Sequence, residues 1–226
     1  MCGIVAYIGE KSAFSILIKG LQRLEYRGYD SAGVAVVSND DAIDRQRALG
    51  KVQLLADAID KHGLIGNVGI AHTRWSTHGK PSESNAHPHI CNSAIAVVHN
   101  GIIENHAELR ERQVSQGFRF TSETDTEVVA HELFIQSEKC GTLLEAVTLA
   151  IKELEGAYAI AVLQRGNHDE MVVARKGSPL VIGIGIGEHF IASDVRVIRH
   201  SYTNIHGPTH VPLRLGCANS TACEFT

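Results

Sequence analysis

Charged side chains, aromatic side chains and long apolar runs are all scarce in this sequence. Of its 226 residues, 20% are charged and 5% are aromatic, and the net charge is -4. Without a block of like charges, the chain lacks an electrostatic footprint for nucleic acid or an acidic membrane. No apolar run approaches the ~20 residues of a membrane helix, and the first residues lack the basic and apolar regions of a signal peptide. We therefore expect a cytoplasmic protein that binds a small polar ligand.

Cysteine is sparse and irregularly spaced, whereas histidine is plentiful. The five cysteines form no CxxC pair and no compact framework, so neither disulfides nor a zinc ribbon is indicated. Among the 13 histidines, His87-Pro88-His89 raises the question of a metal. A zinc site needs three or four convergent ligands, and the proline restrains this pair. We expect no metal and no cofactor, and we interpret these histidines as structural.

Apolar residues make up 44% of the chain, enough for a well-buried core. Short apolar runs predict strands at 3–9, 34–37, 68–71, 94–98, 157–163, 170–174, 180–186 and 189–192. Helical spacing predicts helices after Ser12, Lys51, Asn105, Thr124 and Thr142, with capping boxes formed by Asn105 with Glu108 and by Thr142 with Glu145. Because helices and strands come in groups, we expect an α+β fold of sheets covered by helices.

Cys2 directly follows the initiator methionine. If Met1 is removed, a thiol and a free α-amine share one residue, and the amine titrates close enough to neutral pH to take the thiol proton. On this dipeptide alone, a small residue at the start of a buried strand is the simpler interpretation.

Three further groups follow predicted strands or open a predicted helix, where rigid elements present side chains. The Asn100 amide and the Gly101 backbone N–H are two donors suited to an oxyanion hole, although an Asn-Gly turn is the commoner meaning. Arg74 can hold a carboxylate with its planar fork, and Asp125 can hold an ammonium. Taken singly, each is more often a surface or helix-end charge.

Seven motifs resemble the class II glutamine amidotransferases, in particular the glutaminase domain of glucosamine-6-phosphate synthases, the isomerizing glutamine:fructose-6-phosphate aminotransferases. They are CGI at 2–4, YRGYDSAG at 26–33, HTRWSTHG at 72–79, NAHPH at 85–89, HNGIIEN at 99–105, ETDTE at 123–127 and KGSPLVIG at 176–183. Amidophosphoribosyltransferase, asparagine synthetase and glutamate synthase share the cysteine and the Asn-Gly pair, but the residues around Tyr29 and Trp75 resemble the aminosugar branch.

The resemblance implies an N-terminal-nucleophile hydrolase fold, a four-layer αββα sandwich, and hydrolysis of glutamine through a Cys2 thioester. It implies that Asn100 and Gly101 form the oxyanion hole. The other roles it implies are glutamine binding by Arg74, Trp75, Thr77, His78 and Asp125, and support of the nucleophile by Arg27.

We expect a glutaminase domain at 2–194, an atypical tail at 195–226, and no sugar-phosphate isomerase domain. Fructose 6-phosphate would therefore be bound only by a second domain that is missing here. After Asp194 the family pattern is lost, and we expect a sheet that lacks edge partners. A truncated or frame-altered coding sequence is our preferred explanation; a divergent tail and a partner-binding tail are the alternatives. The full-length form is expected to be a homodimer. An inactive or regulatory glutamine-binding remnant is the rival functional hypothesis.

Overall fold

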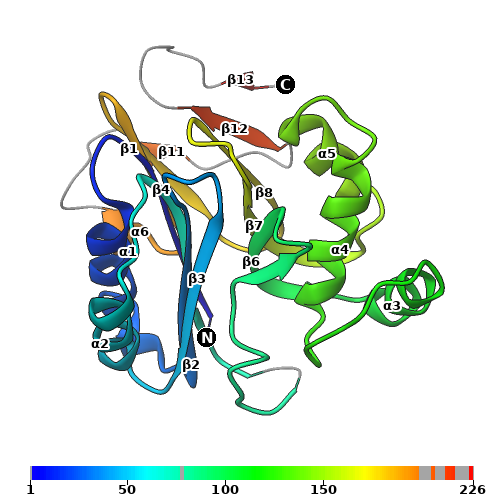
Figure 1. The fold of residues 1–226 in the computed structure, drawn as a ribbon, viewed down its shortest axis with the longest axis horizontal. Coiled ribbons are helices and arrows are strands. Elements are labelled where there is room, and N and C mark those ends of the chain that lie inside the picture. The colour runs from blue at the N-terminus through cyan, green and yellow to red at the C-terminus, as the bar shows by residue number, and fades with distance from the viewer. Residues whose placement is uncertain (1, 77–78, 199–204, 207–211, 217–223, 226) are drawn as a thin grey trace.

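Two antiparallel sheets lie face to face in the middle of the molecule, with helices on both outer sides (Figure 1). The computed structural model describes residues 2–76, 79–198, 205–206, 212–216 and 224–225. The first sheet has the order β11 (Ile205–His206), β9 (Val181–Ile184), β10 (Glu188–Ala192), β1 (Gly3–Gly9), β4 (Val68–Arg74), β2 (Ser31–Val37), β3 (Ile43–Leu49). The second has the order β13 (Glu224–Phe225), β12 (Leu213–Gly216), β8 (Glu170–Lys176), β7 (Gly156–Gln164), β6 (Ile95–Ile103), β5 (His89–Cys91).

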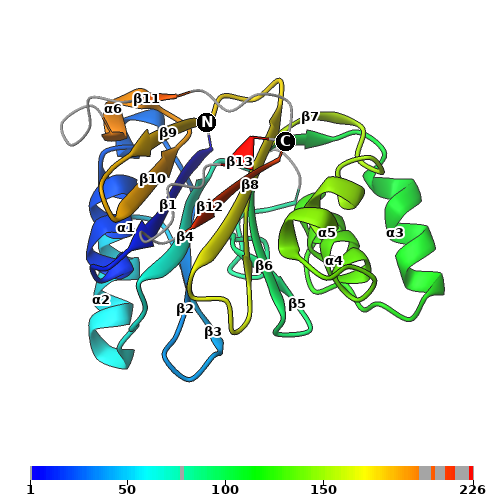
Figure 2. The same ribbon diagram turned by 90° about the horizontal axis from the view of Figure 1, so that it is seen from above.

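The helices form the two outer layers, as the view from above shows (Figure 2). Helices α1 (Ala13–Gln22) and α2 (Val52–His62) cover the first sheet, and α3 (His106–Ser115), α4 (Thr126–Ser137) and α5 (Leu143–Ala150) lie on the side of the second. The short helices are η1 (Glu25–Arg27) and α6 (Val195–Ile198). The predicted α+β, four-layer sandwich is therefore confirmed. Among the described residues, no helix is long and apolar enough to cross a membrane.

Three apolar clusters fill the spaces between the four layers. One lies between the sheets, and the other two lie between each sheet and its helices. Strands β1, β2 and β4 are buried along their whole length. Because both faces of these strands are covered, their sequences are continuous apolar runs and not alternating patterns. The rigid centre of the molecule is therefore the pair of sheets.

Of the two capping boxes predicted from the sequence, one forms and the other does not. Thr142 and Glu145 form the expected reciprocal capping box at the start of α5. Asn105 precedes α3 but makes no side-chain cap; its amide instead donates to the Glu153 carbonyl and its oxygen accepts from the Glu155 N–H. Asn105 thus joins two loops, and the capping box predicted with Glu108 is wrong.

The described part of the tail contributes strands to both sheets, which differs from the expected lack of edge partners. Strand β12 pairs with β8, and β11 pairs with β9. Leu213 and Leu215 are buried, and the half-exposed Arg214 between them pairs with Glu170. This is the two-residue alternation of a strand with one covered face. It is too short to have been recognised in a sequence otherwise without periodicity.

Candidate active site

The N-terminus of β1 and the C-terminal ends of β4 and β6 meet at one end of the sandwich. Gly3 pairs with Thr73 across β1 and β4, which brings Cys2 beside the Arg74-Trp75 corner. Strand β6 carries Asn100 and Gly101 from the other sheet. These strand ends surround a cavity of about 20 Å³ lined by Cys2, Arg74, Trp75, His87, His99, Gly101, Thr124, Asp125 and Thr126. The cavity holds roughly one water molecule.

The Cys2 thiol is bound by the backbone of Trp75. Its Sγ lies 3.4 Å from the Trp75 nitrogen and 3.5 Å from the Trp75 oxygen. Burial raises the pKa of Cys2 above its ordinary value of 9.0, although the Trp75 backbone N–H and the Arg74 charge lower it. At neutral pH the group is therefore a thiol, and attack on a substrate needs a base that removes its proton.

An ion pair holds the main chain at Cys2. Arg27 Nη1 donates to the Cys2 carbonyl at 3.4 Å, and Arg27 Nη2 lies 2.6 Å from the Asp194 carboxylate. Tyr26 also donates to that carboxylate. Beside it, Ser193 Oγ accepts from the Ile4 N–H at 3.0 Å, so the end of β10 is bound to the start of β1. The structure thus places Arg27 against the main chain of Cys2.

The two groups expected to form an oxyanion hole lie on consecutive residues of β6. Asn100 Nδ2 lies 3.5 Å from the Cys2 carbonyl oxygen, and Asn100 Oδ1 lies 2.9 Å from His72 Nε2. Gly101 has φ +129, and a Cβ there would stand 2.0 Å from the Ala157 oxygen. Only glycine fits this position without displacing β7.

Arg74 is buried and already holds several partners on the loop side of the cavity. Its Nη1 donates to Ser76 Oγ at 3.0 Å and lies 3.6 Å from Asp30, while Nη2 donates to the Gly79 carbonyl at 3.1 Å. Asp30 also accepts from the Ser76 N–H and hydroxyl, both at 2.6 Å. The guanidinium fork is therefore fixed in orientation at the cavity wall. Asp30 belongs to a motif recognised in the sequence, but its role was not foreseen.

The other predicted substrate contacts have different positions. Asp125 is buried at the start of α4, where its Oδ2 accepts from the Ile103 N–H at 2.9 Å. The Trp75 ring is about half exposed, at 51%, and packs over Gly28. Thr77 and His78 lie outside the described residues, as does Met1. The structure thus brings Cys2, Arg74, Trp75, Gly101 and Asp125 to one cavity.

Four buried histidines lie at this cavity, and two of them, His87 and His99, line it. The His72 and His87 rings stack with centroids 4.1 Å apart, and His87 Nδ1 accepts from the His99 N–H at 3.3 Å. His89 lies 3.1 Å from Thr124 Oγ1, and His99 lies 2.9 Å from Thr126 Oγ1. Burial lowers the pKa of all four, that of His72 to about 3. The described residues contain no cluster of metal-ligating side chains.

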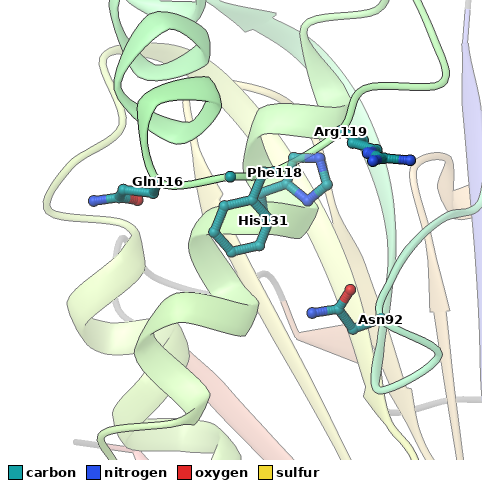
Figure 3. A pocket seen from close by; sticks show the side chains of 6 residues that line it. Asn92, Gln116, Phe118, Arg119 and His131 are labelled. Atoms are coloured by element: carbon teal, nitrogen blue, oxygen red, sulfur yellow. The ribbon is translucent and has the colours of Figure 1, made fainter.

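A second cavity, of about 370 Å³, lies beside the end of α3 and the middle of α4 (Figure 3). It is lined by Asn92, Gln116, Gly117, Phe118, Arg119 and His131. This set includes neither a nucleophile nor a carboxylate, and it shares no residue with the cavity at Cys2. The chemistry-bearing groups are therefore concentrated at the smaller cavity.

Comparison with known proteins assigns the chain to a family. The family model described as "Glutamine amidotransferase domain" matches residues 72–200. The chain therefore belongs to the glutamine amidotransferase domain family.

Two curated relatives are glutamine–fructose-6-phosphate aminotransferases (isomerizing). That of Legionella pneumophila (strain Paris) is 55% identical over 199 residues, covering 88% of this chain and 33% of that protein. That of Pectobacterium atrosepticum is 57% identical over 195 residues, covering 86% and 32%. The chain thus spans about a third of the length of these relatives.

Solved structures share the fold. The glutamine phosphoribosylpyrophosphate amidotransferase of B. subtilis, complexed with ADP and GMP, superposes with a TM-score of 0.78 at 25% identity, covering 95% of this chain and 47% of that one. A glutamine aminotransferase class-II domain protein from Silicibacter pomeroyi gives a TM-score of 0.62 at 16% identity, with 95% of each chain covered. The two antiparallel sheets match the N-terminal-nucleophile hydrolase fold of the B. subtilis amidotransferase.

Proposed function

We propose that this chain hydrolyses L-glutamine to glutamate and ammonia, with Cys2 as the nucleophile. The observation that carries the proposal is the meeting of Cys2, Arg74, Gly101 and Asp125 at one cavity from four separate parts of the sequence. In this proposal Arg74 binds the substrate carboxylate and Asp125 its ammonium. Trp75, Thr77 and His78 are further residues that we propose bind the substrate.

The proposed reaction has two halves. The α-amine of Cys2, freed by removal of Met1, takes the thiol proton as Sγ attacks the side-chain amide carbon of glutamine. The oxyanion that forms is bound by Asn100 Nδ2 and the Gly101 N–H. The amine returns the proton to the leaving nitrogen, the C–N bond breaks, and ammonia departs from a thioester. Water, deprotonated by the same amine, then attacks the thioester carbon. The C–S bond breaks, the amine returns the proton to the Cys2 thiolate, and glutamate is released.

The acceptor of the ammonia is proposed from the relatives. They are named glutamine–fructose-6-phosphate aminotransferases, and about two thirds of their length has no counterpart here. We propose that ammonia from this domain aminates fructose 6-phosphate when a unit equivalent to that remainder is present, and that the full-length form is a homodimer. A thiol nucleophile works in a reducing compartment, so we propose the cytosol as its location.

Incubation of the purified chain with glutamine tests the proposal. We expect glutamate release in proportion to the fraction of molecules that have lost Met1, as counted by mass spectrometry, because a peptide nitrogen cannot act as the base. Full turnover by protein that retains Met1 would exclude the α-amine as the base. An inactive remnant would instead show thermal stabilisation by glutamine without turnover.

A further inference from the structure

The side-chain amide of Asn100 is held at both of its ends. Its nitrogen lies 3.5 Å from the Cys2 carbonyl oxygen, and its oxygen lies 2.9 Å from His72 Nε2. An amide oxygen only accepts hydrogen bonds, so in this pair His72 Nε2 carries the proton and donates it. The contact crosses from the first sheet, where His72 lies in β4, to the second, where Asn100 lies in β6.

The environment of His72 suits a fixed, uncharged donor. The residue is fully buried, and its ring stacks on that of His87 at an interplanar angle of 21°. Burial lowers its pKa to about 3, although the hydrogen bond to Asn100 favours the charged form. The ring is therefore neutral at the pH at which the amine of Cys2 can act as a base. A donor that bears no charge orients the amide without adding a positive field behind the oxyanion.

The two possible orientations of the Asn100 amide differ sharply in catalytic value. With the oxygen towards His72, the NH₂ group lies on the side of the Cys2 main chain, from which we infer that it can donate to a developing oxyanion. Rotated by half a turn, the amide would place its NH₂ against the His72 N–H and its oxygen against the oxyanion. With the proton on His72 Nε2, donor would face donor. In either tautomer of His72, the amide oxygen would face the negative charge of the oxyanion.

We propose that His72 is a positioning residue that holds the Asn100 amide with its NH₂ group towards the reacting carbonyl. This inference rests on the proposed glutaminase function. The role differs from that of a general base: within the described residues, Cys2 Sγ bonds to the Trp75 backbone and has no histidine partner. His72 acts only through Asn100, and this makes the role testable by a double-mutant cycle.

Two substitutions separate the donor from the bulk of the ring. His72→Leu removes the N–H, and we expect kcat for glutamine hydrolysis to fall about 10- to 100-fold with KM nearly unchanged, as for loss of a supporting hydrogen bond. His72→Gln places an amide N–H within similar distance of Asn100 Oδ1 and should recover most of kcat. His131→Leu is the matched control, because it removes another buried histidine, one that contacts Cys91 and not Asn100. It should lower stability without lowering kcat.

The cycle with Asn100→Ala gives the decisive comparison. If His72 works through Asn100, His72→Leu lowers kcat no further once Asn100 is alanine. An equal loss in both backgrounds overturns the proposal, as does an unchanged kcat in His72→Leu or a failure of His72→Gln to recover it.

A readout without turnover keeps the two proposals apart. The Asn100 side-chain NH₂ signals, identified in ¹H–¹⁵N spectra by their loss in Asn100→Ala, should shift in His72→Leu and return in His72→Gln. If processed wild-type protein releases no glutamate, the glutaminase proposal fails while these spectra still test the orientation of the amide. Signals that stay unmoved in His72→Leu overturn it.

Discussion

The groups around Cys2 form a charged side, the ion-paired residues Arg27 and Arg74, and a neutral side, Asn100 with the buried histidines that surround it. Arg27 pairs with Asp194 and Arg74 with Asp30, near a half-exposed Trp75. Asn100, by contrast, stands among uncharged histidines. Charged groups suit recognition of a zwitterionic substrate, and buried neutral donors suit an oxyanion that exists only during reaction. The two sides should therefore respond differently to substitution.

The largest expected effect is at the nucleophile that both sides serve. Cys2→Ala should abolish glutamate release while glutamine still binds, because the proposed head-group contacts lie on other residues. Calorimetric titration with glutamine and a glutamate assay measure the two properties. Cys140→Ala is the control and should keep full activity. Residual turnover in Cys2→Ala would remove Cys2 from the role of nucleophile.

Asn100→Ala tests the neutral side. We expect kcat to fall by about 10²–10³, the usual loss for one oxyanion donor, with little change in KM. Asn167→Ala, in the turn before β8, serves as the matched control. A large rise in KM with an unchanged kcat would show that Asn100 binds the substrate before the reaction. The neutral side would then act in the same way as the charged side.

Arg74→Lys tests the charged side. An ammonium cannot reproduce a two-pronged grip on a carboxylate, and loss of a charged hydrogen bond costs about 1.5–3 kcal/mol. We expect KM for glutamine to rise roughly 10- to 100-fold, with a smaller change in kcat. Arg119→Lys, at the other cavity, should leave both constants as they are. An unchanged KM in Arg74→Lys would remove Arg74 from the substrate site.

Mild acid should weaken the neutral side before the charged side. The folded-state pKa of His72, His87, His89 and His99 lies below the ordinary 6.5, so the unfolded chain binds more protons below that pH. The free energy of unfolding that these neutral histidines contribute is fully present above pH 6.5. It decreases as the pH falls, by up to about 1.4 kcal/mol per pH unit for each histidine.

Urea unfolding between pH 7 and 5 measures this loss, and His89→Gln should make the slope shallower by about one proton. A flat profile would contradict the neutral state of the cluster.

The pKa of Asp194 is lowered from 3.8, since its hydrogen bonds from Tyr26, the Arg196 N–H and Arg27 outweigh its burial. Its contribution is thus complete above pH 3.8 and is lost only in stronger acid.

The smallest expected effect comes from Asp194→Asn, which keeps the shape but removes the charge that fixes Arg27. With about 1 kcal/mol lost from the contact, kcat should fall roughly fivefold. Glu153→Gln is the control, because it weakens a surface ion pair with Arg112 that does not contact the site. A fall as large as that of Asn100→Ala would show that the carboxylate does more than position Arg27.

Continuous apolar runs made most buried strands predictable, and motif order anticipated the gathering of Cys2, Arg74, Gly101 and Asp125. Strand β3 was missed because its sequence, IDRQRAL, is mostly polar at a sheet edge. Strand β5 was missed because it has three residues and follows a proline. The His72–Asn100 contact depends on how two sheets pack, which no local pattern records. The Arg27–Asp194 pair likewise joins residues 167 positions apart.

The shielded thiol of Cys2 also bears on oxidation and chemical labelling. With its pKa raised by burial, Cys2 presents little thiolate to peroxides or alkylating reagents at neutral pH. Cys91 is buried, with a pKa raised to about 12, and is still less reactive. Among the cysteines that the structure describes, Cys2 and Cys140 are both partly exposed. General thiol reagents should therefore modify Cys2 slowly at neutral pH, whereas a reagent shaped like the proposed substrate should modify it faster.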